Sequence, residues 1–434
     1  MKDKFKKYIQ GQLEAAVRTF FTNHPRVKLI AVAGSVGKTS TKMATVHVLE
    51  TRYRVLVHRG NFNTELSVPL TILDLPLPES LYSPVAWFQT LRQAREKAKA
   101  STPFPYDVIV VELGTDKPGD IPHFGTYLRP DLSVVTAVSP EHMEFFKTIE
   151  AVAREELAVS DYSGQLLVNR DDIEESYSTF VKNPLISTYG IGGVAEYHFL
   201  PEQTKADGST SGKFVSPEYG EQQVDLKVIG EHSVKPLIAA GAVAIKFGLN
   251  PQEIRQALED IIGVPGRMQV LRGIHDSMII DDSYNASPLA TAAALQTLYS
   301  LQDRQRIAIL GSMNELGEVS QQEHERIGKL CDNSLLEWVV TIGSEAEKYL
   351  APAAKSRGCQ VRSFMSAYDA GSFVRGVLQP GAAVLVKGSQ NGVFAEEAIK
   401  LLLHSIDDES KLVRQSPDWQ QAKAQYFDKF KSSK

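Results

Sequence analysis

The sequence of 434 residues contains only two cysteines, Cys331 and Cys359, far apart and without Cys-x-x-Cys spacing. This scarcity argues against a disulfide framework or a zinc site and favours a reducing, cytoplasmic location. No apolar run approaches the ~18 residues of a membrane span, and no apolar stretch follows the basic N-terminus as it would in a signal peptide. The formal net charge of −5 gives no reason to expect nucleic-acid binding.

What the sequence does contain is a glycine loop between an apolar run over 27–33 and a helix-like stretch from residue 40. Glycines let backbone N–H groups approach phosphate oxygens, and the helix N-terminus adds positive charge. Lys38 is expected to reach the β- and γ-phosphates and the Thr39 hydroxyl to hold Mg²⁺. The usual first glycine of such a loop is replaced by Val32, and the alternative is a tight turn with an unrelated lysine. The residues expected to bind the nucleotide here are Gly34, Ser35, Val36, Gly37, Lys38, Thr39 and Ser40.

The rest of the chain alternates between strand-like and helix-like segments, which predicts an α/β protein with largely parallel sheets. An amphipathic helix is expected over 1–24, a surface insertion over 76–105, and an antiparallel patch over 190–230 at the edge of the first domain. A hinge is expected at 263–266. The predicted units are an N-terminal helix (1–26), a P-loop parallel-sheet ATPase domain (27–262) and a Rossmann-like C-terminal domain (266–434). Strands are expected over 54–58, 107–111, 132–138, 164–168, 278–281, 306–310, 338–342, 361–364 and 382–386, and the helices of the C-terminal half over 289–300, 321–331, 344–350 and 395–404.

Two polar side chains follow predicted strands of the first sheet. Glu112 ends a strand, and His142 lies just beyond the end of the next one. Ligands gather at the carboxyl ends of parallel strands, so Glu112 is placed to meet the Mg²⁺ near Thr39, and His142 could be a second metal ligand. The alternatives are a solvated strand-end glutamate and a structural histidine.

Further ordered segments resemble the Mur ligase family from about residue 27 to 405, and within it the branch that adds D-Ala-D-Ala to a UDP-muramoyl tripeptide. The matching segments are Gly34-Ser-Val-Gly-Lys-Thr39, Asn61-Phe-Asn63, Glu112-Leu-Gly114, His142-Met-Glu144, Val168-Asn-Arg-Asp-Asp172, Gly230-Glu-His232, Gly266-Arg267, Ile280-Asp-Asp-Ser-Tyr-Asn-Ala-Ser-Pro288, Leu310-Gly-Ser-Met-Asn-Glu-Leu-Gly317 and Val386-Lys-Gly-Ser389.

The resemblance implies an ATP- and Mg²⁺-dependent ligase in peptidoglycan synthesis that activates an acid as an acyl phosphate and joins it to an amino acid or dipeptide. It implies Lys38, Arg267 and two Mg²⁺ ions for charge stabilisation, with Thr39 and Glu112 on one ion and His142 on the other. Asp282, Tyr284 and Asn285 would approach the nucleotide from the C-terminal domain as the domains close. Its partners would be small molecules, and we expect a monomer.

Four departures from the family pattern affect these expectations. The segment before the loop strand is too short for the UDP-binding N-terminal domain. Where the family has a carbamylated lysine, this sequence has Glu156, whose carboxylate is hypothesised to hold the second Mg²⁺; the alternative is a solvated helix-face glutamate. Gln390 replaces an arginine, and Ser233 and Pro236 replace an asparagine pair.

Two other functions stay open at this point. One is a Mur-type ligase that extends another small acid, as folylpolyglutamate or cyanophycin-type ligases do. The other is a nucleotide-binding pseudo-enzyme, which the joint presence of Lys38, Thr39, Glu112, His142 and Arg267 argues against.

Overall fold

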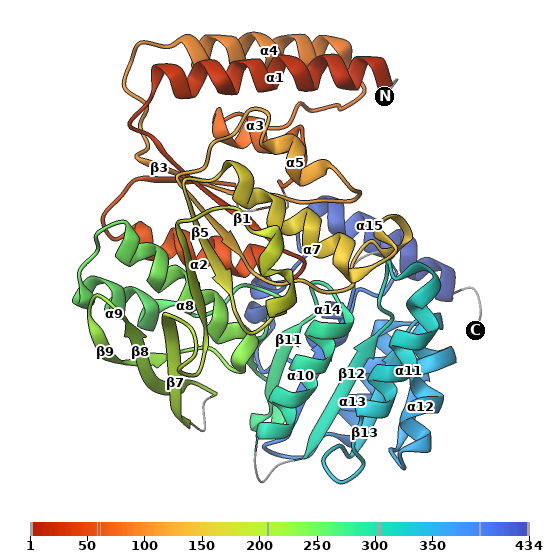
Figure 1. Ribbon diagram of the computed structural model, residues 1–434. Coiled ribbons are helices and arrows are strands. Elements are labelled where there is room, and N and C mark those ends of the chain that lie inside the picture. The colour runs from red at the N-terminus through yellow and green to blue at the C-terminus, as the bar shows by residue number, and fades with distance from the viewer. Residues whose placement is uncertain are drawn as a thin grey trace.

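The computed structural model describes residues 3–58, 60, 62–205, 208–301, 305–389 and 392–431, so Asn61 and Gln390 lie outside the described residues. The chain forms two β-sheets, each covered by helices, and the second follows the first in the sequence (Figure 1). This arrangement confirms the predicted α/β class. No helix in the described ranges is both long and apolar enough to cross a membrane.

The first sheet has the order β2-β3-β1-β4-β5-β6-β7-β8-β9, parallel as far as β7 and antiparallel from there to β9. The predicted antiparallel patch therefore continues the edge of the parallel sheet. Its strands are β1 (Lys28–Ala33), β2 (Val55–Val57), β3 (Val108–Glu112), β4 (Leu132–Val135), β5 (Gln165–Asn169), β6 (Ile186–Ile191), β7 (Tyr197–Thr204), β8 (Thr210–Ser216) and β9 (Gly220–Leu226).

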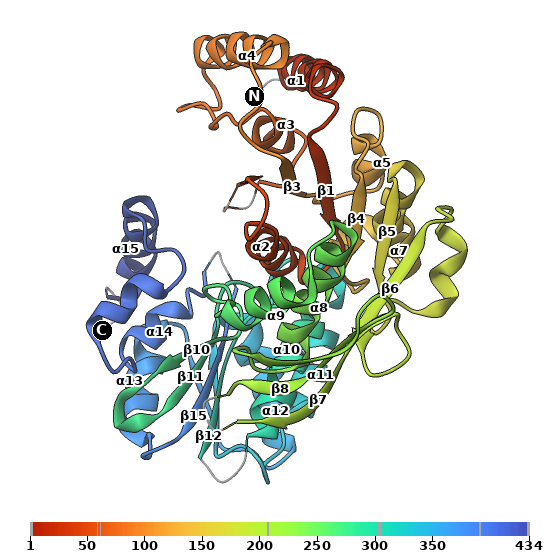
Figure 2. The same ribbon diagram turned by 90° about the vertical axis from the view of Figure 1, so that its left-hand side faces the viewer.

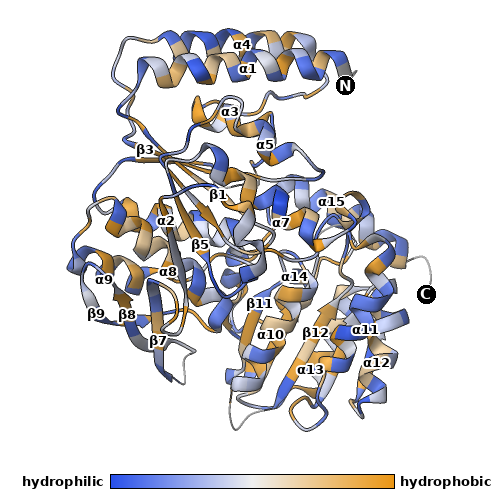
Figure 3. Cartoon of the chain, in the orientation of Figure 1, coloured by the Kyte–Doolittle hydropathy of each residue, from blue (hydrophilic) through white to orange (hydrophobic). Residues whose placement is uncertain are grey.

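Helices cover both faces of this sheet because successive strand side chains point to opposite sides. Ile30 and Val32 of β1 belong to the core beneath α2 and α8, whereas Leu29 and Ala31 belong to the core beneath α1 and α4. The apolar strand centres are visible in Figure 3. The helices of this part are α1 (Asp3–Asn23), α2 (Lys38–Leu49), α3 (Ser67–Ile72), α4 (Pro84–Lys99), α5 (Asp120–Phe124), α6 (Met143–Phe146), α7 (Ile149–Leu157), α8 (Glu231–Lys246) and α9 (Pro251–Asp260), with 3₁₀ turns η1 (Ala158–Tyr162) and η2 (Glu175–Phe180).

The second sheet has the order β10-β11-β15-β12-β13-β14 and is parallel except for β10. Its strands are β10 (Gln269–Arg272), β11 (Met278–Asp282), β12 (Arg306–Gly311), β13 (Trp338–Ile342), β14 (Val361–Phe364) and β15 (Ala383–Lys387). Its helices are α10 (Pro288–Ser300), α11 (Ser320–Leu330), α12 (Ala351–Ser356), α13 (Ala367–Val377), α14 (Glu396–Lys400) and α15 (Pro417–Lys431), with short turns η3 (Ile274–Asp276), η4 (Gly317–Val319), η5 (Ala346–Leu350) and η6 (Ile406–Lys411).

Two predicted elements are shorter in the structure, and one strand of the structure was not predicted. The strand predicted over 132–138 ends at Val135, and the helix predicted over 395–404 reaches only from Glu396 to Lys400. The antiparallel edge strand β10 was not expected. Its four residues lie directly after the predicted hinge and pair with the next strand, β11, as a hairpin. A segment of four residues is too short for its pattern of apolar and polar residues to predict a strand.

The parallel register decides where the polar strand ends meet. Val32 of β1 lies beside Glu112 of β3 on one side and Val134 of β4 on the other. The carboxyl ends of these strands therefore share one edge, where the glycine loop leaves β1 and enters α2. Figure 2 shows α2, α8 and α9 between the first sheet and the second.

Candidate active site

A cavity of about 1780 Å³ lies at this edge and is lined from both halves of the chain. The glycine loop and the ends of β3 and β4 form one side. The segment after β11 and the predicted hinge form the other. The cavity residues used below are Lys38, Thr39, Glu112, His142, Arg267, Asp282, Tyr284 and Asn285.

The glycine loop has the backbone that its sequence predicts. Gly34 and Gly37 have φ of 121° and 87°, a region that favours glycine, and a Cβ on Gly34 would lie 2.3 Å from Thr136 Oγ1. The N–H of Gly34 donates to Glu156 and that of Ser35 to the Ala137 carbonyl. The N–H groups of this loop that remain open to a ligand are therefore those at the start of α2 rather than those of Gly34 and Ser35.

Lys38 starts α2, and its ammonium donates to the Gly34 carbonyl and lies 3.9 Å from the Glu141 carboxylate. Burial by itself lowers the pKa of Lys38. The carboxylates of Glu141, Glu156 and Glu112 outweigh that effect, so the pKa is raised. Lys38 is thus a charged group facing the cavity.

Thr39 and Glu112 place a hydroxyl and a carboxylate side by side in the cavity. The Thr39 hydroxyl donates to Glu112 Oε2 at 3.0 Å, and Asn63 Nδ2 donates to the other carboxylate oxygen at 3.4 Å. Only 3% of Glu112 is exposed, so the alternative of a solvated strand-end glutamate is wrong. Burial raises its pKa, but the positive charges of Lys42, Lys38 and Arg267 overcome this and lower it. An ionised carboxylate beside a hydroxyl is the oxygen set that Mg²⁺ prefers.

Lys42 also contacts this carboxylate. Its buried ammonium lies 3.2 Å from Glu112 Oε2. Lys42 follows Lys38 by one helical turn, a spacing visible in the sequence, but its ion pair depends on the packing of α2 against β3. This residue was missed by sequence reasoning.

His142 precedes α6 with φ of 46°, and its Nε2 lies 3.7 Å from the Asp116 carboxylate. It lines the cavity, as expected of a ligand from the β4 edge. Among the described residues, no three His, Cys, Asp or Glu side chains are gathered closely enough to hold a metal ion. Glu112, His142 and Glu156 therefore do not form one cluster.

Glu156 lies behind the glycine loop rather than in the cavity. It is fully buried, is absent from the cavity lining, and its Oε2 accepts the Gly34 N–H at 2.7 Å. The alternative of a solvated helix-face glutamate is therefore wrong. Burial raises its pKa well above the usual value; Lys38 opposes this, and Glu141 adds to it. A proton between the two carboxyls would satisfy Glu156 Oε1 and Glu141 Oε1, which have no other hydrogen-bond partner in the described part of the chain.

Arg267 connects the two halves of the cavity. Its Nη2 donates to Thr39 Oγ1 at 3.4 Å, and its guanidinium lies 4.3 Å from the centre of the Tyr284 ring. The backbone reverses direction just before it, with positive φ at Gly263 and Gly266. The predicted hinge therefore delivers the arginine directly to the glycine loop.

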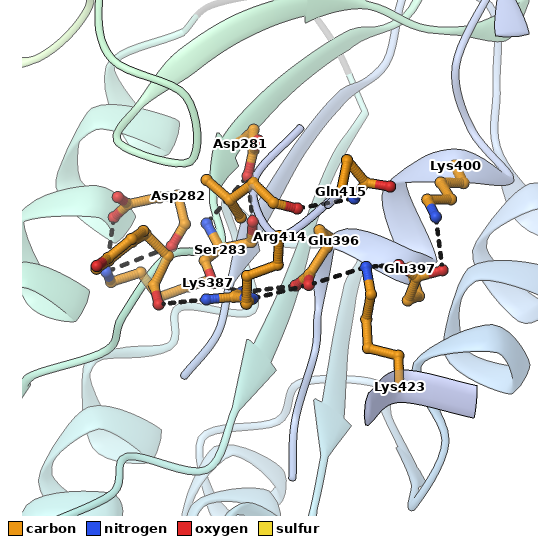
Figure 4. A network of polar contacts seen from close by, with 12 residues as sticks. Asp281, Asp282, Ser283, Lys387, Glu396, Glu397, Lys400, Arg414, Gln415 and Lys423 are labelled. Atoms are coloured by element: carbon orange, nitrogen blue, oxygen red, sulfur yellow. Dashed lines mark hydrogen bonds and ion pairs between the residues drawn. The ribbon is translucent and has the colours of Figure 1, made fainter. Parts of the chain in front are cut away.

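The segment that carries Asp282, Tyr284 and Asn285 is held by buried ion pairs (Figure 4). Asp282 lies 2.8 Å from the Lys387 ammonium, which also donates to the Asn285 carbonyl. Arg414 donates to the Ser283 and Tyr284 carbonyls at 2.8 and 3.0 Å. The segment after β11 is thus fixed by contacts from β15 and from the C-terminal segment.

Arg414 is in turn paired with Glu396 at 2.6 Å, and Lys423 lies 2.5 Å from Glu397 (Figure 4). All four side chains are buried. Sequence reasoning missed this network, because nothing in the polar C-terminal sequence distinguishes these charges from solvated ones.

Comparisons with known proteins agree with this architecture. The family model of the Mur ligase middle domain matches residues 90–244, and that of the Mur ligase glutamate ligase domain matches residues 266–390. The UDP-N-acetylmuramoyl-tripeptide–D-alanyl-D-alanine ligase of Bacillus subtilis is 27% identical over 388 residues, covering 87% of this chain and 76% of that protein. Its Escherichia coli counterpart is 26% identical and covers 77% of this chain and 68% of that protein.

Solved structures show the same relationship. MurF from Acinetobacter baumannii superposes with a TM-score of 0.71 at 25% identity, over 87% of this chain and 77% of that chain. MurF ligase from Thermotoga maritima in complex with ADP has a TM-score of 0.73 at 23% identity, over 92% and 84%. Folylpolyglutamate synthase from Mycobacterium tuberculosis, also complexed with ADP, has a TM-score of 0.64 at 17% identity, over 90% and 94%. The last two establish a shared fold.

Proposed function

Because this chain belongs to the Mur ligase family, we propose that it is an ATP-dependent, ADP-forming ligase that adds D-Ala-D-Ala to a UDP-muramoyl tripeptide in peptidoglycan precursor synthesis. The observation that carries the proposal is the meeting of Thr39, Glu112 and Arg267 across the two halves. It supports phosphoryl transfer because cationic and oxygen ligands surround the start of α2.

The first step forms a bond between an acceptor carboxylate oxygen and the γ-phosphorus of ATP and breaks the bond from that phosphorus to ADP. Both reactants are anionic, so the residues chiefly supply positive charge and position. Lys38 and the N–H groups at the start of α2 would bind the phosphates, and Arg267 would approach from the opposite side. Mg²⁺, when bound, supplies further charge neutralisation; Thr39 and Glu112 would hold it, and His142 would be the ligand of a second ion.

In the second step the incoming amine attacks the acyl carbon, and phosphate leaves from the tetrahedral intermediate as the amine loses a proton. The acyl phosphate must be kept from water until the amine arrives. We propose that closure about 263–266 provides this protection, with Asp282, Tyr284 and Asn285 approaching the nucleotide from the C-terminal side. The same proposal includes the domain limits 27–262 and 266–434, which the two separate sheets support, and a cytoplasmic location, which the two free cysteines support. It also includes a monomeric state.

The test is ATP-dependent phosphate release with UDP-muramoyl tripeptide and D-Ala-D-Ala, with mass analysis of the product and a Lys38→Ala control. Product that depends on Lys38 supports the proposal. Turnover with another acid alone would retain the chemistry and reject the substrate. ATP binding without turnover of any acid would identify a pseudo-enzyme.

A further inference from the structure

Helix α1 forms part of the cavity wall. Lys7, Gln10, Gly11 and Glu14 line the cavity, and their i, i+3, i+4, i+7 spacing places them on one face of the helix. Ile9, Leu13 and Val17 are fully buried against the first sheet, which fixes the orientation of that face. Helices α1 and α4 lie together at the end of the molecule remote from the second sheet (Figures 1 and 2).

The region beside α1 is continuous with the phosphate end of the cavity. We call it the distal lobe; it is lined by Lys7, Gln10, Gly11, Glu14, Glu65, Lys117, Asp120 and His123. Asn63 and Glu112 lie between it and Thr39, within the same cavity. A molecule reacting beside Thr39 and Glu112 can therefore extend to α1 without leaving the cavity.

Gly11 is unusual in this wall. It lies inside a 21-residue helix, where alanine is the more stabilising residue. Its φ is not positive, and a Cβ built on it meets no atom within 4 Å. Neither backbone geometry nor packing requires a glycine at this position. What the glycine provides is open space on the cavity side of α1.

The polar groups of the distal lobe favour an anionic ligand. Its carboxylates already have partners: Glu65 lies 2.5 Å from Lys6, Glu14 lies 2.7 Å from His123 Nε2, and Asp120 accepts the N–H groups of Asp116 and Lys117. The ammonium groups of Lys7 and Lys117 have no ion-pair partner among the residues that the structure describes. The Gln10 amide nitrogen is also engaged, since it donates to Glu14 at 2.9 Å and lies 2.7 Å from His123 Nε2. The two ammonium groups are thus the donors available to a negatively charged, oxygen-rich group.

We propose that this face of α1 binds the end of the acceptor acid remote from its reacting carboxylate, and that Gly11 supplies the clearance for it. Residues 3–23 lie outside both stretches that the family models match, so the assignment concerns this chain's own helix. It rests on the proposed function, since it assumes that an acid is activated at Thr39 and Glu112. Gly11 is a specificity-determining position and takes no part in the chemistry.

The test compares Gly11→Ala and Gly11→Trp in the full chain. A matched control is Gly376→Trp, because Gly376 lies in α13, also has open space around a built Cβ and does not line the cavity. Steady-state kinetics would be measured with UDP-muramoyl tripeptide, with the muramoyl tripeptide lacking the nucleotide, and with the tripeptide alone.

The tryptophan at position 11 should raise the KM of the full-length acceptor at least about tenfold, a change of about 1.4 kcal/mol. The effect should shrink with each shorter acceptor, and the KM for ATP should stay unchanged. Gly11→Ala should raise the melting temperature, and Gly376→Trp should leave every KM unchanged. An equal penalty for all acceptors, a parallel rise in the KM for ATP, or an unchanged acceptor KM would overturn the inference. If the wild-type protein turned over none of the acceptors, that result would instead overturn the proposed function on which this inference rests.

Discussion

Replacing Glu156 distinguishes support of the glycine loop from the metal-binding role that the family resemblance suggested. In the structure its carboxyl accepts the Gly34 N–H at 2.7 Å and lies outside the cavity lining. Glutamine has the same shape as a protonated glutamate: its oxygen can accept from Gly34, and its amide can donate to Glu141. We therefore expect Glu156→Gln to retain stability within about 1 kcal/mol and to retain turnover and Mg²⁺ dependence.

Glu156→Ala removes the same contacts without a replacement. The buried Gly34 N–H loses its acceptor, which costs about 1–3 kcal/mol, and the truncated side chain leaves a cavity that adds about 1–2 kcal/mol. Denaturant unfolding should show a loss of about 2–5 kcal/mol in all, with slower turnover because the loop is less well fixed.

The pH dependence provides a second readout. The pKa of Glu156 is raised in the folded protein, so above pH of about 4.3 the unfolded chain releases a proton that the folded chain retains. Folding then binds protons, and stability falls as the pH rises toward the folded pKa, by up to about 1.4 kcal/mol per pH unit. The stability of Glu156→Gln relative to wild type should therefore increase between pH 5 and 7. The reasoning is refuted if the glutamine variant loses turnover about as strongly as the alanine variant and requires more Mg²⁺, since the carboxylate itself would then be needed.

Three other substitutions test the site and its supports. Arg267→Ala should lower kcat at least about a hundredfold and should shift the unfolding midpoint little, because the side chain is half-buried. A loss of stability large enough to explain the loss of kcat would contradict the assignment. Lys42→Met leaves the Glu112 carboxylate buried without its 3.2 Å partner and should cost about 3–5 kcal/mol at pH 7. Because Lys42 helps to lower the pKa of Glu112, this loss should shrink as the pH falls below the unfolded pKa of about 4.3, and an equal loss at pH 7 and at about pH 3 would refute this. Arg414→Ala should cost about 3–5 kcal/mol in denaturant unfolding because buried Glu396 loses its 2.6 Å partner and keeps only Lys423 at 3.6 Å; an unchanged midpoint would show that the pair contributes nothing.

Local features of this fold could be predicted from the sequence because they depend on neighbouring residues. The glycine loop needs positive φ at Gly34 and Gly37, which the residue type itself provides. The place of Glu112 followed from a topological rule, since parallel strands bring their carboxyl ends to one edge. The alternation of strand-like and helix-like segments likewise predicts the α/β class, because it depends on local sequence alone.

Features that depend on long-range packing could not be predicted. Glu155 and Glu156 are adjacent in the sequence and look equally solvated, yet both are buried, and each accepts backbone N–H groups from a different loop. The same is true of Arg414, whose partner Glu396 lies in a segment expected to continue as a longer helix. The sequence shows the same residue type whether the charged side chain is buried or exposed. Only the folded structure shows which partner lies close enough to pair with a buried charge.

The protonation of Glu156 bears directly on phosphate binding. Three cations surround the start of α2, namely Lys38, Lys42 and Arg267, and the carboxyl groups of Glu112 and Glu141 lie among them. A third carboxylate would cancel the remaining positive charge at the point where the nucleotide's phosphates must bind. Burial behind the loop raises the pKa of Glu156 well above its usual value, which favours the neutral carboxyl, while Oε2 still accepts the Gly34 N–H. Glu156 thus holds the loop in its conformation without adding a negative charge beside it. A solvated glutamate would not hold the loop, and an ionised metal ligand would add the negative charge.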